Sequence, residues 1–430
     1  MTTTHELRHD VVINGTDGAA RGAGQCRSCG SVLRHTVVDL GMSPLCESYV
    51  SREQLDGPET FYPLHVLVCE TCFLVQLQQY VPREAIFTEY AYFSSYSDSW
   101  LAHARRYTEE VTRRFNLGAT SRVVEIASND GYLLQYFVER GIPALGVEPA
   151  ANVARVAREK GVRTRVEFFG CETARVIARD EGHADLLIGN NVLAQVHELN
   201  DFIGGLKILL APEGVITIEF PHLMRLVAEN QFDTIYHEHF SYFSLFAVEW
   251  AFGAHGLVVF DVEELPTHGG SLRIFACHAG EERDRLSDRV AALRAREAAA
   301  GVNTLAYYAS FEEQVRETKR RILEFLISAR REGRRVVGYG APGKGNTLLN
   351  YCGIRTDFLE YTVDRNPYKQ GKYLPGTHIP ILAPEAIRNM RPDYVFVLPW
   401  NLRDEIVGQL GYIRKWNGRF VVPIPTVEVV

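Results

Sequence analysis

Four cysteines near the start of the chain have the residue types and the spacing of a metal site. They form two pairs, Cys26 with Cys29 and Cys69 with Cys72, and two residues separate the members of each pair. Two such pairs supply four thiolates, which complete a tetrahedral zinc site that has no open position for catalysis. The alternative is two disulfides or a redox motif, but no βαβ pattern accompanies either pair. The spacing therefore predicts a structural Zn²⁺ in a small N-terminal module.

The densest group of titratable side chains lies in the middle of the chain, at residues 236–242 (Tyr-His-Glu-His-Phe-Ser-Tyr). In an extended segment, His237 and His239 would share one face and Glu238 would point to the other. A histidine can remove a proton from the carbon beside a keto group if the resulting enolate is stabilised. The alternative is a pair of structural histidines near a domain interface. We favour acid–base chemistry for the cluster as a whole.

A glycine turn that follows a buried strand indicates a nucleoside cofactor. The dinucleotide fingerprint has three glycines, and this turn keeps only Gly131. A turn crowded by Ala127 and Asn129 favours a cofactor without phosphates, and S-adenosylmethionine (SAM) is the common one. Glu148 ends the next expected strand, 23 residues after Glu125, and is placed to accept hydrogen bonds from ribose hydroxyls. NAD and an ordinary tight turn are the alternatives.

A second glycine-rich turn lies at residues 338–347 (GYGAPGKGNT), between another buried strand and a helix. Backbone N–H groups at such a turn converge on an anion, and Lys344 adds positive charge there. The order of residues is not that of a P-loop, because Gly345 follows the lysine where Ser or Thr is required. The turn predicts that Gly343, Lys344 and Asn346 contact the phosphates of a bound nucleotide without hydrolysing ATP.

A later strand ends at the edge where open sheets bind ligands, and it is followed by Pro399, Trp400 and Arg403. We expect Trp400 to pack on a base or a sugar and Arg403 to pair with phosphate. Lys369 and Lys372 flank a glycine after an earlier strand. A solvated loop is the favoured interpretation of these two lysines, and contact with phosphate is the alternative.

The elements that position these residues alternate between strands and helices. Strands are expected at residues 122–127, 144–148, 185–190 and 214–220, and again at 335–339, 359–363 and 394–398, with helices between them. This alternation gives parallel sheets covered on both faces. A charged helical stretch at 281–332 links the two sets. The predicted fold class is α/β, with a small zinc-binding N-terminal module followed by two Rossmann-like doubly wound α/β domains.

Composition narrows the possible partners. The 430 residues are 46% hydrophobic and 23% charged, as in ordinary soluble proteins. A net charge of −7 argues against nucleic acid or an anionic membrane as the main partner. No apolar run reaches transmembrane length, and residues 1–24 lack the apolar segment of a secretory signal. Four further cysteines are scattered without a pairing pattern, which fits a reducing cytoplasm. We expect a cytoplasmic protein.

Four motifs occur in the order found in three-part sugar C-methyltransferases, at residues 125–131, 190–194, 236–239 and 340–345. The chain resembles this family over nearly its whole length after the tail. It looks closest to enzymes that methylate C-3′ of dTDP-linked amino-4-ketosugars, in the biosynthesis of branched deoxysugars of the tetronitrose type for antibiotics. We expect a monomer with a flexible tail (1–24), a zinc-binding domain (25–84), a SAM-binding methyltransferase domain (85–300) and a C-terminal Rossmann-like domain that binds the sugar nucleotide (301–430).

The resemblance also implies roles for individual residues. His239 is the implied base, Tyr236 and Glu238 support it, and Tyr90 lies near the active site. The cofactor-binding residues that it implies include Asn190 and Asn191. The implied reaction is proton removal at C-3′, followed by attack of the enolate on the S-methyl group. The alternatives are N-methylation of the sugar amine and a non-catalytic, zinc-bearing protein that binds nucleotides.

One catalytic position departs from the family. After residues 190–194 the family pattern carries a histidine, and this chain has Gln195, which forms hydrogen bonds but cannot hold a proton near neutral pH. If the position takes part in proton transfer or stabilises the enolate with a charge, Gln195→His should raise turnover and add a titration near neutrality. Steady-state kinetics across pH test this. Unchanged kinetics would leave Gln195 as a binding or packing residue.

Overall fold

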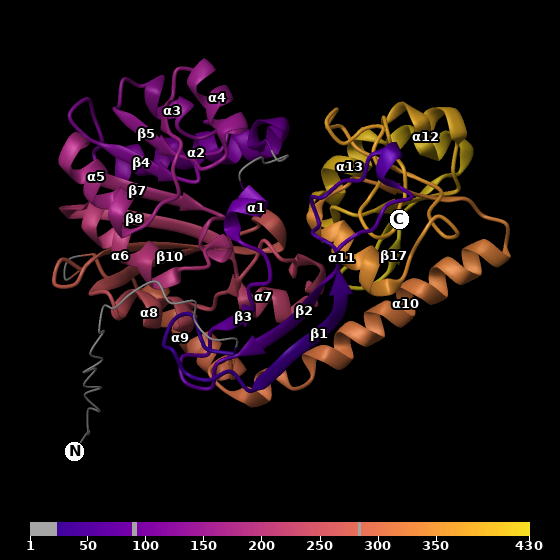
Figure 1. The fold of residues 1–430 in the computed structure, drawn as a ribbon, viewed down its shortest axis with the longest axis horizontal. Helices are drawn as coiled ribbons and strands as arrows, with labels where there is room; N and C mark the ends of the chain where they lie inside the picture. The colour runs from indigo at the N-terminus through magenta and orange to yellow at the C-terminus, as the bar shows by residue number, and fades with distance from the viewer. Residues whose placement is uncertain (1–23, 88–92, 283–284) are drawn as a thin grey trace.

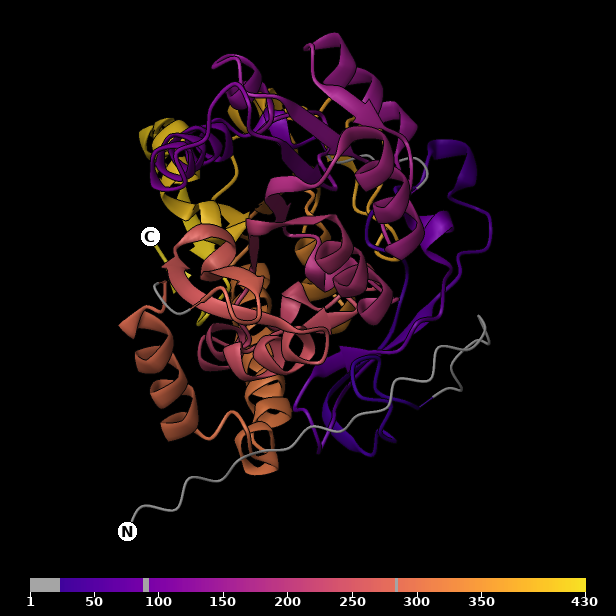
Figure 2. The ribbon, with the colours of Figure 1, turned by 90° about the vertical axis from the view of Figure 1, so that its left-hand side faces the viewer.

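The structure, a computed structural model, describes residues 24–87, 93–282 and 285–430. Three sheets organise these residues. Figure 1 shows two α/β domains side by side, here called the middle and the C-terminal domain, with the strands of the N-terminal module below and between them. Figure 2, turned by 90°, shows the middle domain in front of the C-terminal one. The predicted fold class is confirmed.

The N-terminal module is built on an antiparallel sheet of four strands in the order β1-β2-β3-β9. Two of the metal-site cysteines precede β1, and the other two lie in the turn between β2 and β3. The fourth strand comes from the middle domain, more than 160 positions further along the chain, and pairs with β3. The sequence analysis did not predict this strand. The strands are β1 (His35–Ser43), β2 (Tyr62–Val68), β3 (Val75–Leu77) and β9 (Ser241–Tyr242).

The middle domain has a seven-stranded sheet in the order β10-β11-β8-β7-β4-β5-β6. Five of its strands are parallel, and the central ones, β4, β5 and β7, are mostly apolar because helices cover both faces. The strands are β4 (Val123–Ile126), β5 (Ala144–Val147), β6 (Arg163–Arg165), β7 (Ala184–Asn190), β8 (Leu210–Pro221), β10 (Leu257–Leu265) and β11 (Ser271–His278). The helices are α2 (Asp98–Arg114), α3 (Gln135–Val138), α4 (Ala151–Glu159), α5 (Cys171–Glu181), α6 (Leu199–Leu209), α7 (Leu223–Ala228) and α8 (Leu245–Gly253), and the shorter α1 (Arg83–Phe87) precedes them.

The four strands expected in this domain are parallel, but the sheet continues into two strands that the sequence analysis did not predict. The strands β10 and β11 form an antiparallel hairpin, and β11 also pairs antiparallel with β8. Only residues 266–270 connect β10 to β11. A parallel connection needs a dozen or more residues, so a turn this short enforces the antiparallel pairing.

The C-terminal domain repeats the α/β plan with six strands in the order β14-β13-β12-β15-β16-β17. All are parallel except β17, which pairs antiparallel with β16. The strands are β12 (Val336–Tyr339), β13 (Thr362–Val363), β14 (Ile381–Leu382), β15 (Tyr394–Val397), β16 (Arg419–Val422) and β17 (Glu428–Val429), and the helices are α11 (Gly343–Cys352), α12 (Glu385–Met390) and α13 (Arg403–Gln409).

Two helices, α9 (Asp288–Ala300) and α10 (Phe311–Arg331), link the two α/β domains. The first ends at Gly301, whose left-handed φ of 83° breaks the helical stretch. The buried residues of α10 recur every three or four positions, from Phe311 through Val315 to Leu326. This apolar stripe packs along the N-terminal module and the C-terminal domain (Figure 1). In the described part of the chain, no helix combines the length and apolar character that crossing a bilayer requires.

A buried arginine between two of the metal-site cysteines joins the N-terminal module to the middle domain. Arg27 donates to the backbone oxygen of Phe240, to Ser241 Oγ at 3.0 Å and to the backbone oxygen of Leu77 at 2.5 Å. Its backbone N–H donates to the side chain of Gln76 on β3 at 3.0 Å. These bonds fix the segment that enters β9, directly after the histidine cluster.

The loop after β1 reaches the C-terminal domain. Val50 and Tyr373 exchange backbone hydrogen bonds of 3.0 and 2.9 Å. The Tyr49 hydroxyl donates to the backbone oxygen of Ala341 at 2.6 Å, beside the second glycine turn. Glu59 accepts the backbone N–H of Gly376 at 2.9 Å. The N-terminal module therefore contacts both α/β domains and fixes their relative position.

The buried arginine gives a test of this arrangement. Arg27→Met leaves several backbone acceptors in the interior without their donor, and each unsatisfied group costs about 1–3 kcal/mol. We expect the free energy of unfolding to fall by about 2–4 kcal/mol in urea titrations. The exposed Arg34 of the same module is the control, and Arg34→Met should change stability by less than about 0.5 kcal/mol. Equal effects of the two substitutions would contradict the proposed role of Arg27.

Candidate active site

A cavity of about 900 Å³ lies where the three parts of the chain meet. The carboxyl ends of β4, β5 and β7 border it on one side, and those of β12, β13 and β15 on the other, as expected for open α/β sheets. The N-terminal module contributes Glu47. The predicted residues that line it are Ala127, Asn129, Glu148, Asn190, Asn191, Gln195, Tyr236, Glu238, His239, Gly343, Lys344 and Pro399.

Six further residues were predicted to belong to the site. Five of them are described by the structure but are not among the residues that line the cavity: Glu125, Gly131, Asn346, Trp400 and Arg403. The sixth, Tyr90, lies outside the described residues, so its role stays a prediction.

The turn after β4 forms the cofactor edge of the cavity. Ala127 and Asn129 both have left-handed backbones, with φ of 57° and 49°, which fold the chain back toward the end of β5. The backbone N–H groups of Asn129 and Ala150 each donate to Glu148 at 2.9 Å, one to each carboxylate oxygen. Burial raises the pKa of Glu148 to about 7. This carboxylate is held in one orientation and keeps an acceptor site on each oxygen for a ligand.

Gly131 is required for packing beneath the cofactor edge. Its φ is 74°, and a Cβ at this position would lie 3.1 Å from Val162 and 3.2 Å from Ala157. Glycine is therefore required for packing against α4 and the start of β6. Glu125 lies buried beneath the same turn, where desolvation raises its pKa well above the usual range and the Tyr132 hydroxyl opposes that shift. Both residues support the cofactor edge from behind.

The histidine cluster forms a turn, so the prediction of an extended segment is wrong. The backbone N–H of His239 donates to the backbone oxygen of Tyr236 at 2.8 Å. His237 therefore points away from the cavity, and its Nε2 lies 3.3 Å from the backbone oxygens of Tyr62 and Pro63 on β2. Glu238 and His239, predicted to face opposite sides, both line the cavity. Pairing of the next residues with β3 causes the turn.

His239 has the arrangement of a base. Its Nδ1 lies 2.9 Å from the backbone oxygen of Thr234, so Nδ1 carries the proton and donates it. Nε2 then keeps a lone pair. Burial lowers the pKa of His239 to about 4, which makes the ring neutral at physiological pH. The ring of Tyr236 lies against the imidazole, with 4.1 Å between the ring centroids, and limits its rotation.

Glu238 has the arrangement of a hydrogen-bond donor. Burial, and to a smaller extent the nearby Glu47, raise its pKa to about 8, so the carboxyl is protonated at neutral pH. The Cys46 thiol of the N-terminal module lies 3.3 Å from its Oε1. Lys369 lies 3.6 Å from Glu47 and partly opposes the shift. A protonated carboxyl at a cavity can donate to an oxygen that gains negative charge.

The ammonium group of Lys344 lies over the ring of Trp400. Its Nζ donates to Asn401 at 2.9 Å and lies 4.5 Å from the centre of the Trp400 ring. Burial lowers the pKa of Lys344. The indole N–H of Trp400 donates to Asp233 at 2.6 Å, and its ring approaches Gly269. The ring is thus occupied by protein contacts and does not present the stacking surface that the sequence analysis expected.

Two other side chains that were predicted to contact the substrate bond to other parts of the chain. Arg403 pairs with Glu428 at 2.7 Å on the surface. The Asn346 amide donates to the backbone oxygen of Cys46 at 2.6 Å and so holds the N-terminal module against α11. Both predictions rested on the position at a strand or helix end, and tertiary contacts redirected the side chains.

The structure adds a charged network that the sequence analysis missed. Glu219 is buried and accepts hydrogen bonds from His103 at 2.9 Å, Arg273 at 2.8 Å and Thr267 at 2.8 Å. These partners hold the pKa of Glu219 down to about 2 despite its burial. His103, Arg273 and Thr267 line the cavity. A charged residue, Glu219, inside the buried apolar run of β8 was the available signal, because unpaired buried charges are rare.

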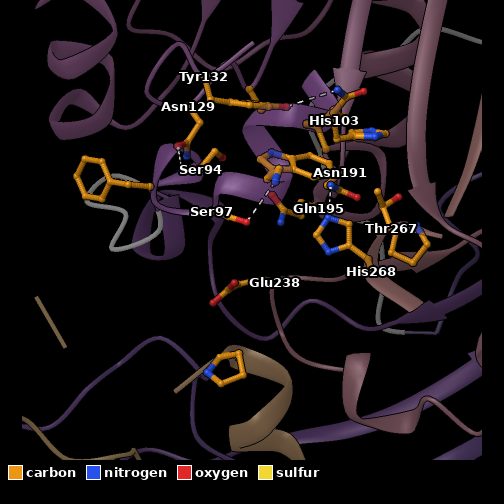
Figure 3. Close-up of a pocket in the computed structure, with 18 of the residues that line it drawn as sticks. Ser94, Ser97, His103, Asn129, Tyr132, Asn191, Gln195, Glu238, Thr267 and His268 are labelled. Atoms are coloured by element: carbon orange, nitrogen blue, oxygen red, sulfur yellow. Dashed lines mark hydrogen bonds between the residues drawn. The ribbon is translucent and has the colours of Figure 1, made fainter. Parts of the chain in front are cut away.

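The hairpin turn between β10 and β11 brings this network to the cofactor side. His268 has a left-handed φ of 54° and lies 3.0 Å from the amide of Asn191. Figure 3 shows Gln195, Asn191 and His268 close together, while Glu238 lies apart from them on a different segment. Thr267 and His268 of this turn line the cavity.

The four cysteines of the N-terminal module fit a zinc ion. Their sulfur atoms all lie within 4.8 Å of one another, and two pairs are 3.5 Å apart, close to the roughly 3.8 Å of a tetrahedral ZnS₄ site. The Gln76 amide donates to Cys26 Sγ at 3.1 Å, which stabilises a thiolate. Among the described residues, the cavity lining includes none of these cysteines, so the ion would be structural.

Comparison with known proteins gives matches along most of the chain. Residues 26–87 match the family model of a zinc binding domain, residues 100–262 that of a methyltransferase domain, and residues 266–425 that of the C-methyltransferase C-terminal domain. The C-methyltransferase NovU of Streptomyces niveus is 37% identical over 406 residues, which cover 94% of this chain and 96% of NovU.

Solved structures match a smaller part. Magnesium protoporphyrin IX methyltransferase (ChlM) from Synechocystis PCC 6803 with bound SAH is 14% identical, with a TM-score of 0.34, over 42% of this chain and 83% of ChlM. The PH0226 protein from Pyrococcus horikoshii OT3 is 15% identical, with a TM-score of 0.37, over 45% of this chain and 97% of that protein.

Proposed function

This chain belongs to the family of C-methyltransferases with a zinc-binding, a methyltransferase and a C-terminal domain, and from that premise we propose that its SAM-dependent reaction methylates a dTDP-linked 4-ketosugar. The methylated carbon in this proposal is C-3′ of an amino-4-ketosugar, beside the C-4′ carbonyl. The product is a branched deoxysugar of the kind used in antibiotics.

The observation that carries the proposal is the pair formed by His239 and Glu238 on one side of the cavity. A neutral imidazole with a lone pair on Nε2 can take a proton from carbon, and a protonated carboxyl can donate to the carbonyl oxygen. Carbon methylation beside a carbonyl needs both groups at once. Methylation of an amine needs the base alone.

The proposed steps follow from these two groups. His239 Nε2 accepts the C-3′ proton, the electron pair of that C–H bond forms the C-3′=C-4′ double bond, and the carbonyl π pair moves onto the C-4′ oxygen, to which Glu238 donates a hydrogen bond. SAM, when bound, would supply a methyl group on a positively charged sulfur, and C-3′ of the enolate would bond to that methyl carbon as the S–CH₃ bond breaks, the C-4′ carbonyl re-forms and S-adenosylhomocysteine leaves. Glu148 and Asn129 are placed to hold the donor at the other side of the cavity, and His239 finally releases its proton to water.

Positive charge on the C-terminal side supports a diphosphate-bearing substrate. Lys344, Arg365 and Lys369 all line the cavity, although the chain as a whole has a net charge of −7. They lie at or near the carboxyl ends of β12 and β13. Cations gathered on one side of a cavity attract phosphate groups and orient them there.

The proposed base is tested by hydrogen exchange. In D₂O with S-adenosylhomocysteine and no methyl donor, the wild type should exchange the C-3′ hydrogen of a dTDP-linked 3-amino-4-ketosugar, as followed by NMR. His239→Asn should slow this exchange by about 10²-fold or more while S-adenosylhomocysteine still binds. His237→Asn is the control, since this side chain faces β2, and exchange should persist. A wild type that methylates the amine without any C-3′ exchange would establish N-methylation instead.

The shifted pKa values of His239 and Glu238 predict how activity depends on pH. The base must be neutral, so activity should fall as pH drops through about 4, with no change near 6.5. The donor must be protonated, so activity should also fall as pH rises through about 8. Glu238→Gln keeps an N–H donor that does not titrate, so the loss near pH 8 should disappear from kcat/KM. If the variant keeps that loss, another group titrates there.

A further inference from the structure

An aspartate of the C-terminal domain occupies the position that Glu148 occupies in the middle domain. Asp364 directly follows β13, as Glu148 directly follows β5. Each acid therefore ends the strand that lies next to the first strand of its own domain, β12 or β4. Both acids line the same cavity, from opposite sides.

The backbone around the two acids repeats as well. Ala127, the first residue after β4, donates its N–H to the backbone oxygen of Val147 at 2.8 Å. Gly340, the first residue after β12, donates to Val363 at 2.7 Å. Both donors have left-handed backbones, with φ of 57° and 87°. In each domain the acceptor is the residue immediately before the acid.

The hydrogen bonds to the carboxylates follow the same plan. Glu148 accepts one backbone N–H from the turn after β4 and one from the second residue after itself. Asp364 accepts the N–H of Ala341, in the turn after β12, at 2.7 Å and that of Asn366 at 2.8 Å. Each bond uses a different carboxylate oxygen. Both carboxylates are thereby oriented before any ligand arrives, with acceptor sites left on both oxygens.

This arrangement has a known chemical use in open α/β sheets. An acid at the end of the second strand accepts hydrogen bonds from the hydroxyls of a nucleoside's pentose, while the preceding turn approaches the phosphates. In the C-terminal domain that turn carries Gly340, where a Cβ would lie 2.6 Å from Pro399. Beyond Asp364 the cavity is lined by Ile406 and Gln409 of α13, which offer one apolar and one amide surface for a base.

We infer that Asp364 accepts a hydrogen bond from the pentose hydroxyl of the nucleoside diphosphate that carries the sugar. The inference rests on the proposed function for the nature of the substrate. The nucleoside then lies between Asp364 and α13, its diphosphate lies along the turn 340–344, and the sugar reaches His239. The two domains would each hold one nucleoside, SAM on Glu148 and the carrier on Asp364, with the reacting groups between them.

Calorimetry with two nucleotides tests this inference. Thymidine diphosphate and 3′-deoxythymidine diphosphate differ by the one hydroxyl that Asp364 would bind. At saturating S-adenosylhomocysteine, the wild type should bind thymidine diphosphate at least about tenfold more tightly, as expected for a hydrogen bond to a charged group. Asp364→Asn should reduce this preference to about twofold or less, and S-adenosylhomocysteine affinity should stay unchanged.

Asp393→Asn is the matched control. Asp393 also accepts a backbone N–H, that of Arg335 at 2.8 Å, but it lies at the opposite end of β12 and β15. This variant should keep the full preference. Equal binding of the two nucleotides by the wild type would overturn the inference without any variant, and so would a full preference in folded Asp364→Asn. If thymidine diphosphate does not bind the wild type at all, the proposed carrier is wrong and the inference falls with it. Should Asp364→Asn fail to fold, Asp364→Glu is used, and it must weaken thymidine diphosphate binding.

Discussion

The hydrogen bonds between the zinc-binding module and residues 240–242 are the constraint on which the active site depends. Arg27 lies between two metal-binding cysteines, so the tetrahedral site fixes its backbone before its side chain reaches Phe240 and Ser241. The backbone N–H of Phe240 also donates to Ala194 at 2.7 Å, next to Gln195. His239 directly precedes this double attachment. A metal that touches no reacting atom can therefore set the orientation of the proposed base.

The same module brings the two α/β domains together around a shared cavity. Its loop after β1 bonds to the C-terminal domain through Tyr49, Val50 and Glu59, while β3 pairs with a strand of the middle domain. Glu47 lines the cavity, and the thiol of Cys46 donates to Glu238, which also lines it. Because of these contacts, the carboxyl ends of strands from both α/β sheets border the same cavity.

Burial gives neighbouring groups opposite protonation states in this cavity. His239 has no anionic partner, so desolvation keeps it neutral. Glu238 is buried close to a second carboxylate, so it holds its proton at neutral pH. Glu219 is equally buried but is paired with Arg273 and His103, so it stays ionised. Desolvation and charge pairing thus separate an acid, a base and a fixed anion within one site.

The sequence by itself determined the features of this protein that depend on residues close together in the chain. The spacing of the cysteines predicted the metal site, and the alternation of strands and helices predicted two α/β domains. The turns that carry Asn129 and Gly343 predicted the two edges of the cavity. Each of these patterns depends on a few consecutive residues. Side-chain direction depended on distant partners. His237 points away from the cavity, next to the place where β9 pairs with β3. The Trp400 ring contacts Asp233 and Lys344 and is not free to stack on a ligand. The hydrogen bonds of Asp364 join strands that lie far apart in the chain. Long-range contacts of this kind have no local pattern, and only the tertiary structure decided them.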